Sequence, residues 1–256
     1  MSNLWPLWNR KPADLWKKHR VRKITDRDVQ VMCLPELNSE TLNGMIEQRN
    51  TVKPFPTADL ERHKVGVLHA YPGVRSHILA CCPLSWAMYV LGQERTGELS
   101  RAESFHRLAV SVMVTTVDRL YVLAKRSAVG VENYPNVWHV SAAGYVDCRD
   151  LSSGDALRSA AWRELSEEMT LTASDTSTLE LLGMCEHLTP GKSIYEVCFR
   201  TCTHLSASHV LQRAADASDA WEGKHHAYSA TEVTDLLRRE KFNPAGAATL
   251  MMSLGI

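Results

Sequence analysis

The sequence lacks a net charge. Its 256 residues contain 29 Lys and Arg against 29 Asp and Glu, so the formal charge at pH 7 is zero. A protein without an overall positive field has no general attraction for nucleic acid or for an acidic lipid surface. We therefore expect neither a nucleic-acid partner nor a membrane partner, and any anion must be bound by a local arrangement of residues.

Paired cysteines and long apolar runs are also missing. The seven cysteines include no C-x-x-C pair, and several, such as Cys198, lie in apolar stretches. We therefore expect neither a disulfide framework nor a zinc knuckle. The pattern favours reduced, buried thiols in a cytoplasmic protein. The most apolar run, Ile78–Leu91, is too short to span a membrane and contains Pro83. The first residues lack a signal-peptide pattern, which again favours a cytoplasmic location.

What the sequence does contain is an acidic helix face. Glu164, Glu167 and Glu168 are spaced three and four residues apart, which places them on one face of a helix of about 3.6 residues per turn. Like charges at this spacing destabilise an exposed helix by roughly 0.2–0.5 kcal/mol per pair. A hard divalent cation such as Mg²⁺, which favours carboxylate oxygens, is the natural candidate to neutralise them.

The chain divides into two regions. Residues 1–104 mix short patterns, including a strand at Val29–Leu34 and a helix at Ser39–Asn50, which predicts an N-terminal α+β extension. The polar stretch Gly97–Glu103 marks the boundary with residues 105–256. We expect the first region to contribute either to a recognition pocket or to the interface of a homodimer.

The second region has a more regular pattern. Apolar runs and capping signals predict strands at Leu108–Val114, Leu120–Ala124, Val137–Ser141, Leu179–Leu188 and Ile194–Cys202, and a helix at Asp155–Thr170. The capping box Ser229 to Glu232 and the pair Asn243-Pro244 predict two late helices. Residues 142–154 and His225-His226 are expected in loops. Hairpin strands with helices between and after them predict an α/β fold, an α/β/α sandwich with a mixed β-sheet.

The segment Gly144–Leu171 resembles a Nudix box, the loop–helix–loop signature of a family of pyrophosphohydrolases. The family pattern is a glycine, five residues, a glutamate, seven residues, Arg-Glu, an apolar residue, any residue, Glu-Glu, any residue, a glycine and an apolar residue. Seven residues separate Asp155 from Arg163, as the pattern requires. The matching residues are Arg163, Glu164, Leu165, Glu167, Glu168 and Leu171. The resemblance implies a Nudix fold for residues 105–256.

Three positions depart from this pattern. Asp155 replaces the first glutamate, Thr170 replaces the second glycine, and ten residues instead of five separate Gly144 from Asp155. Aspartate keeps the charge, and Thr170 lies beyond the acidic face. The enlarged loop is therefore the departure that bears most on the site.

The resemblance implies a role for each residue of the acidic run. Glu164 and Glu168 would be metal ligands, Glu167 would help to ligate the metal or activate water, and Arg163 would orient a glutamate through a charge-assisted hydrogen bond. The carbonyl region of Gly144 would complete the metal shell. The implied cofactor is Mg²⁺ or Mn²⁺, because an all-oxygen site suits hard cations.

Residues outside the run are also implicated. Family members often add one further acid, for which Glu196 is the first candidate and Glu222 the second. Lys125 and Arg126 resemble the basic pair that often contacts phosphate or nucleotide in the family. On their own, these residues would be typical of solvent-exposed strand ends and loops.

The expected function is metal-dependent hydrolysis of a diphosphate linkage in a small nucleoside diphosphate derivative. A nucleotide sugar, an ADP-ribose-like compound and a modified nucleotide all fit. Two alternatives share the fold: an enzyme like isopentenyl diphosphate isomerase, for which Cys148 would be the catalytic cysteine, and a ligand sensor that has lost catalysis.

Overall fold

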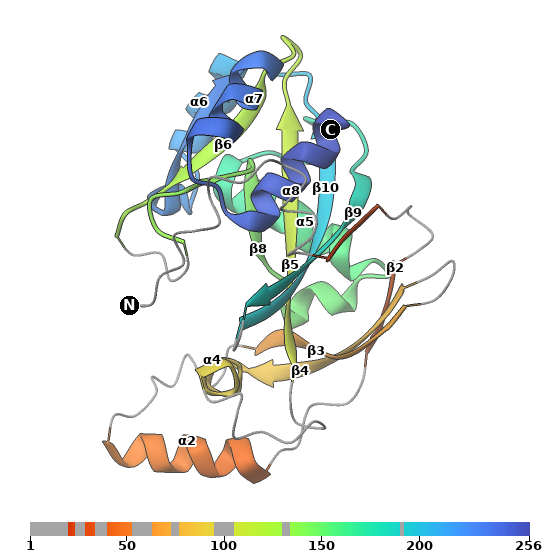
Figure 1. Ribbon diagram of the computed structural model, residues 1–256, viewed down its shortest axis with the longest axis vertical. Coiled ribbons are helices and arrows are strands. Elements are labelled where there is room, and N and C mark those ends of the chain that lie inside the picture. Colours follow the sequence, from red (N-terminus) through yellow and green to blue (C-terminus); the bar gives the residue numbers. More distant parts are fainter. Residues whose placement is uncertain are drawn as a thin grey trace.

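The computed structural model describes residues 20–23, 29–33, 40–52, 63–72, 77–94, 105–129, 134–189 and 192–256. Their strands form one mixed sheet with helices on both faces (Figure 1). The boundary expected at Gly97–Glu103 lies outside the described residues. No helix in the described segments is long and apolar enough to cross a membrane.

The centre of the sheet is formed by two long parallel strands. β5 (His106–Thr115) pairs in parallel with β10 (Lys192–Cys202), which pairs antiparallel with β9 (Glu180–Thr189). β1 (Arg20–Lys23) adds to the other side of β9. β5 is buried along almost its whole length, as is typical of a strand covered on both faces. The three long strands lie where the sequence predicts them.

Strands from the N-terminal region continue the same sheet. β3 (His63–Pro72) pairs with β5 through Val67 and His106, and β4 (His77–Ser85) and β2 (Val29–Cys33) follow beyond it. Side chains of β3, β4 and β5 share one core cluster. The sheet and its core therefore run across the two regions expected from the sequence.

Two helices of the N-terminal region pack together beside this part of the sheet. α2 (Glu40–Val52) and α4 (Trp86–Glu94) lie at the lower end of the molecule in Figure 1, near β3 and β4. Their apolar side chains, including Leu42 and Leu91, form a second cluster with Leu84. α2 and β2 agree with the helix and strand predicted for this region.

The remaining layers cover the two faces of the central strands. Alternate residues of a strand point to opposite faces, and β10 follows this rule. Val197 packs into the cluster that contains α5 (Ala156–Met169) and α6 (Ala207–Ala215). Its neighbour Cys198 packs against α8 (Pro244–Leu254) on the other face. This arrangement confirms the predicted α/β/α sandwich with a mixed sheet.

A smaller set of elements packs beside β5. β6 (Tyr121–Arg126) pairs with β7 (Trp138–His139) and with β11 (Gly223–Tyr228), and α7 (Ala230–Arg239) follows. The loop expected at His225-His226 is wrong, because both residues lie in β11. Pairing with β6, about a hundred residues earlier in the chain, makes this segment a strand, and no local pattern signals it.

The expected loop at 142–154 is also wrong in part. It contains β8 (Ala142–Tyr145), which pairs with β5, and a short 3-10 helix, η3 (Cys148–Ser152), capped by Asp147. Four residues without an alternating pattern give no strand signal, so the long-range pairing with β5 decides the conformation. This segment and α5 position the candidate site.

Candidate metal-binding and catalytic site

Helix α5 carries the acidic run and has well-defined ends. Asp155 caps its first turn, because its side chain accepts a hydrogen bond from the backbone N–H of Arg158. The helix ends at Thr170 in the left-handed conformation, with φ 53° and ψ 35°. Glycine favours this conformation and a β-branched residue resists it. Thr170 therefore stands at the end of the helix, beyond the three glutamates.

The three glutamates of α5 differ in their surroundings. Glu164 and Glu168 are buried, at 7% and 9% exposed. Glu167 is partly exposed and lies at the surface end of the same face. A pair of buried carboxyl groups one turn apart is unusual, because burying a charge is costly unless it is neutralised.

Strand β8 lies directly over the buried pair. The backbone N–H of Ala143 donates to Glu168 Oε1 at 2.9 Å. A Cβ atom added at Gly144 would collide with the carboxylate of Glu164. Only glycine lets this carboxylate approach the strand so closely, so Gly144 belongs to the site in spite of the enlarged loop that follows it.

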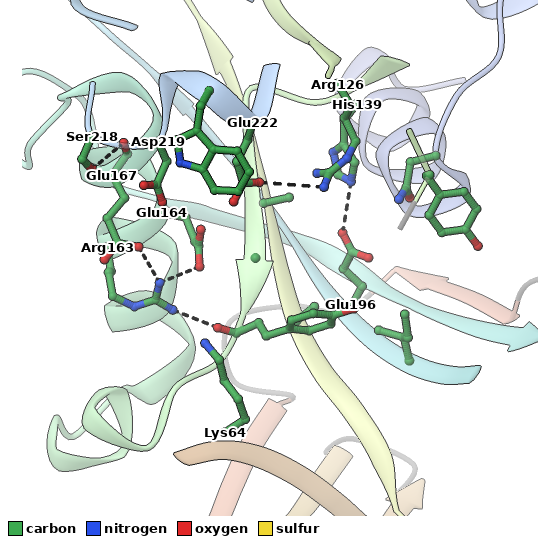
Figure 2. A pocket seen from close by; sticks show the side chains of 18 of the residues that line it. Lys64, Arg126, His139, Arg163, Glu164, Glu167, Glu196, Ser218, Asp219 and Glu222 are labelled. Atoms are coloured by element: carbon green, nitrogen blue, oxygen red, sulfur yellow. Dashed lines mark hydrogen bonds and ion pairs between the residues drawn. The ribbon is translucent and has the colours of Figure 1, made fainter. Parts of the chain in front are cut away.

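Arg163 connects the acidic groups to the loop. Its Nη1 donates to Glu164 Oε1 at 2.6 Å and to Glu167 Oε2 at 2.8 Å, as Figure 2 shows. Its Nη2 donates to the carbonyl oxygen of Tyr145 at 2.9 Å and to Asp150 Oδ2 at 3.1 Å. A guanidinium group with this many fixed partners holds the side chains of Glu164 and Glu167 in place.

Burial controls the protonation of the two inner acids. Desolvation raises the pKa of Glu164 to about 7, although Arg163 and Lys64 oppose the shift. Burial, together with the charges of Glu164 and Glu222, raises the pKa of Glu168 well above its ordinary value. Burial thus disfavours the charged form of both acids, the charge of Glu164 adds to this effect at Glu168, and a bound cation would oppose it.

The acidic face opens on a cavity of about 600 Å³. Its wall carries charges of both signs. The acids are Glu164, Glu167, Glu196, Asp219 and Glu222, and the bases are Lys64, Arg126, Arg149 and Arg163. Glu168 lies in a small adjoining pocket that shares Ala143 and Glu222 with this cavity. Such a wall suits a ligand that combines a cation with an anionic group.

Both candidates for the additional acid line the cavity. Glu196 is 5% exposed and hydrogen-bonds to Ser111 Oγ, and its Oε1 lies 4.0 Å from His139 Nε2. Figure 2 shows this pair on the side of the cavity away from Glu164. Glu222 lines the small pocket that also contains Glu168, whereas Glu196 does not. Among the two candidates, Glu222 is therefore the one that shares a pocket with a buried acid of α5.

The basic pair predicted at the end of β6 is split. Arg126 lines the cavity with its Nη2 3.8 Å from Glu222 Oε2, and no hydrogen-bond partner for its buried Nε lies among the described residues. Lys125 instead lies 3.8 Å from Glu240 and packs over the ring of Trp138. Neighbouring strand residues point to opposite faces, so the structure brings only Arg126 to the cavity.

The donor set fits a hard divalent cation in charge and chemistry. Glu164 and Glu168 supply buried carboxylate oxygens, and the cradle at Gly144 leaves room for one of them. Among the described residues, no three acidic, histidine or cysteine side chains already converge on one point. The buried pair would supply the first ligands of such a cation, while Glu167 forms ion pairs with Arg163 and Arg149.

Several residues of this site have no signal in the sequence. Asp150, which holds Arg163, is buried within the enlarged loop. Lys64 reaches the cavity from β3, and Trp221 lies on its wall with 58% of its surface exposed. Ser218 and Asp219 bind the backbone oxygen of Glu167 and so fix the segment before Trp221. These contacts join distant parts of the chain, which local patterns do not reveal.

Comparison with known proteins adds similarities of structure. No protein-family model matches the sequence, and no curated protein matches it. Among solved structures, the MutT protein from Methanosarcina mazei Go1 is 15% identical, with a TM-score of 0.40, over 59% of this chain and 93% of its own.

Two further solved structures are described as Nudix proteins. The NUDIX domain of Shewanella oneidensis NrtR, complexed with ADP ribose, is 12% identical, with a TM-score of 0.43, over 66% of this chain and 97% of its own. A NUDIX hydrolase from Nitrosomonas europaea is 14% identical, with a TM-score of 0.43, over 59% and 89%. This chain is similar in structure to these proteins, and at these identities and TM-scores the similarity does not specify the reaction.

Proposed function

We propose that this protein is a divalent-metal-dependent hydrolase that cleaves a diphosphate linkage in a nucleoside diphosphate derivative. The observation that carries the proposal is the buried pair Glu164 and Glu168, set beneath Gly144 at the edge of a cavity of about 600 Å³. Carboxylates buried this closely need a compensating positive charge, and an all-oxygen pair suits Mg²⁺ or Mn²⁺.

The basic residues of the cavity support a diphosphate as the substrate. Cleavage of a diphosphate increases the negative charge on phosphoryl oxygens, and a bound Mg²⁺ or Mn²⁺ supplies charge neutralisation and an activated water. Arg126 and Arg149 lie on the same wall as the acids and would bind the remaining phosphate oxygens. A site for a free metal ion alone would not need these cations.

Each residue of the acidic helix has a separate task in this proposal. Glu164 and Glu168 hold the metal, and Arg163 keeps Glu164 in position. Glu167 is the most exposed of the three and is tied to two arginines. It would either complete the metal shell, by turning toward the buried pair, or take the proton of the attacking water. Glu222 and Glu196 are the first and second candidates for the further acid.

The nucleoside part of the proposal is supported by Trp221. A large aromatic side chain that is 58% exposed on a cavity wall is available to stack on a base. Its segment is fixed on both sides, since Asp219 N–H donates to Glu167 O at 3.0 Å and Ser127 N–H to Glu222 O at 2.7 Å. A base on Trp221 would leave its phosphates near Arg126 and the acidic helix.

The isomerase alternative is not favoured. Cys148 lies in η3, where its Sγ contacts the backbone oxygen of Lys64 at 3.3 Å, and it is not among the residues of the cavity wall. A catalytic cysteine must reach the substrate. The sensor alternative differs from the enzyme only in turnover, so the same experiment separates the two.

The test is a panel of substrates with product identification. ADP-ribose, a nucleotide sugar, a modified nucleoside triphosphate and isopentenyl diphosphate are each incubated with the protein in Mg²⁺, Mn²⁺ or EDTA. We expect metal-dependent release of a nucleoside monophosphate from at least one nucleotide and no reaction in EDTA. Binding of these compounds by thermal shift without any turnover would reject the enzyme and identify a sensor.

A further inference from the structure

A buried lysine from the N-terminal region lies on the wall of the cavity. Lys64 belongs to β3 and is 4% exposed. Figure 2 shows its side chain pointing toward the side of the cavity that carries Arg163 and Glu164. Lysine is almost never fully buried without a partner, because removing its charge from water is costly. We therefore ask which residues hold the buried ammonium group in place and which ligand it could bind.

The enlarged loop supplies the structural cause. Lys64 Nζ lies 3.3 Å from Asp147 Oδ2. The backbone N–H of Val65 donates to Val146 O at 3.2 Å, and Cys148 Sγ contacts Lys64 O. All three partners lie between Gly144 and Asp155, where the loop is five residues longer than the family pattern. The enlarged loop thus contacts β3 at Lys64 and Val65.

Lys64 faces the acidic helix as well as the loop. It lines the same cavity as Gly144 and Glu164, and Figure 2 shows it on the side of that cavity where Glu164 lies. The ammonium group therefore lies on the wall beside the place where a phosphate bound to the metal would lie. An ammonium with three N–H donors can serve Asp147 and a ligand at the same time.

We propose that Lys64 binds a phosphate oxygen of the diphosphate substrate, so that the N-terminal region completes the active cavity through the enlarged loop. This inference rests on the proposed function for the identity of the ligand. It assigns to β3 the role of bringing a cation to the site, and to Asp147 the role of holding that cation.

The experiment measures binding and catalysis separately. The probe for binding is α,β-methylene-ADP, a non-hydrolysable nucleoside diphosphate, titrated with excess Mg²⁺ in a calorimeter. The variants are Lys64→Met, Lys64→Arg and Asp147→Asn. Lys224→Met removes an exposed lysine outside the cavity and is the matched control. The values of kcat and KM are measured with the substrate that the panel identifies.

A lost phosphate contact has a defined signature. Lys64→Met should raise both the dissociation constant of the probe and KM by about 10- to 100-fold, which corresponds to the free energy of a charge-assisted hydrogen bond. Lys64→Arg should recover part of this loss. Asp147→Asn keeps the cation, so its binding should stay within about threefold of the wild type or become tighter. Lys224→Met should have no effect.

A second comparison separates loss of binding from loss of stability in Lys64→Met. Because Lys64→Met removes the ion pair of the half-buried Asp147, the double variant with Asp147→Asn is compared with Asp147→Asn alone. Equal binding of the probe by the double variant and by Asp147→Asn would overturn the proposal. Equal losses of binding in Lys64→Met and Asp147→Asn would do the same, because Lys64 would then have a purely structural role. Lys64-dependent binding without hydrolysis would reject the proposed function and keep this inference. Hydrolysis that is unaffected by Lys64→Met would reject this inference and keep the proposed function.

Discussion

The stability of the metal-free protein is expected to fall as the pH rises through neutrality. Burial raises the pKa of Glu164 to about 7 in the folded protein, against an ordinary value of 4.5. Between these values the folded state holds a proton that the unfolded state has released. Because the folded state binds more protons, the free energy of unfolding decreases with rising pH, by about 3 kcal/mol for this group once both states are ionised. The raised pKa of Glu168 acts in the same direction.

The assay is urea unfolding in EDTA at intervals from about pH 5 to about pH 8, repeated with Glu164→Gln. Burial lowers the pKa of His225, which contributes the opposite slope. The informative quantity is therefore the difference between wild type and variant. We expect this difference to change by about 3 kcal/mol across the range and to shrink in excess Mg²⁺, since the cation replaces the proton. A difference that does not depend on pH would refute the raised pKa and the reasoning built on it.

Three other predictions follow from single positions. Thr170→Gly should raise the free energy of unfolding by about 1 kcal/mol in urea, because glycine accepts the left-handed conformation at the end of α5; a decrease would contradict this. Gly144→Ala should weaken Mg²⁺ binding, measured by calorimetry, by about tenfold or more, because the added Cβ displaces the Glu164 carboxylate. Unchanged affinity would show that Gly144 is not part of the site. Arg126→Met should raise KM by about tenfold while Lys125→Met leaves it nearly unchanged, since only Arg126 reaches the cavity; equal effects would show that the pair acts together.

The acidic helix could be predicted because its signals are local. The spacing of Glu164, Glu167 and Glu168 is read directly on a helix, and Asp155 marks its first turn. The long strands β5, β9 and β10 could be predicted for the same reason, since each contains several apolar residues close together. The fixed distance from Asp155 to Arg163 then linked the helix to a family pattern.

The rest of the site depends on contacts between distant segments. Lys64 and Asp147 are 83 residues apart, and nothing near Lys64 marks it as part of a cavity. The strand β8 and the strand β11 form only through their pairing with β5 and β6. Taken alone, Glu196 would be typical of a solvent-exposed edge strand, whereas its strand pairs on both sides and its side chain is buried. In each case the tertiary pairing determines the environment of the residue.

The most direct test of the central claim is the activity of Glu168→Gln. The variant removes one buried carboxylate and keeps the shape of the side chain, and Glu47→Gln, exposed on α2, is the matched control. In Mg²⁺, with the substrate that the panel identifies, Glu168→Gln should release nucleoside monophosphate at least about 10²-fold more slowly than wild type. It should remain folded, and Glu47→Gln should be fully active. Full activity of Glu168→Gln would contradict the assignment of the buried pair as the metal site.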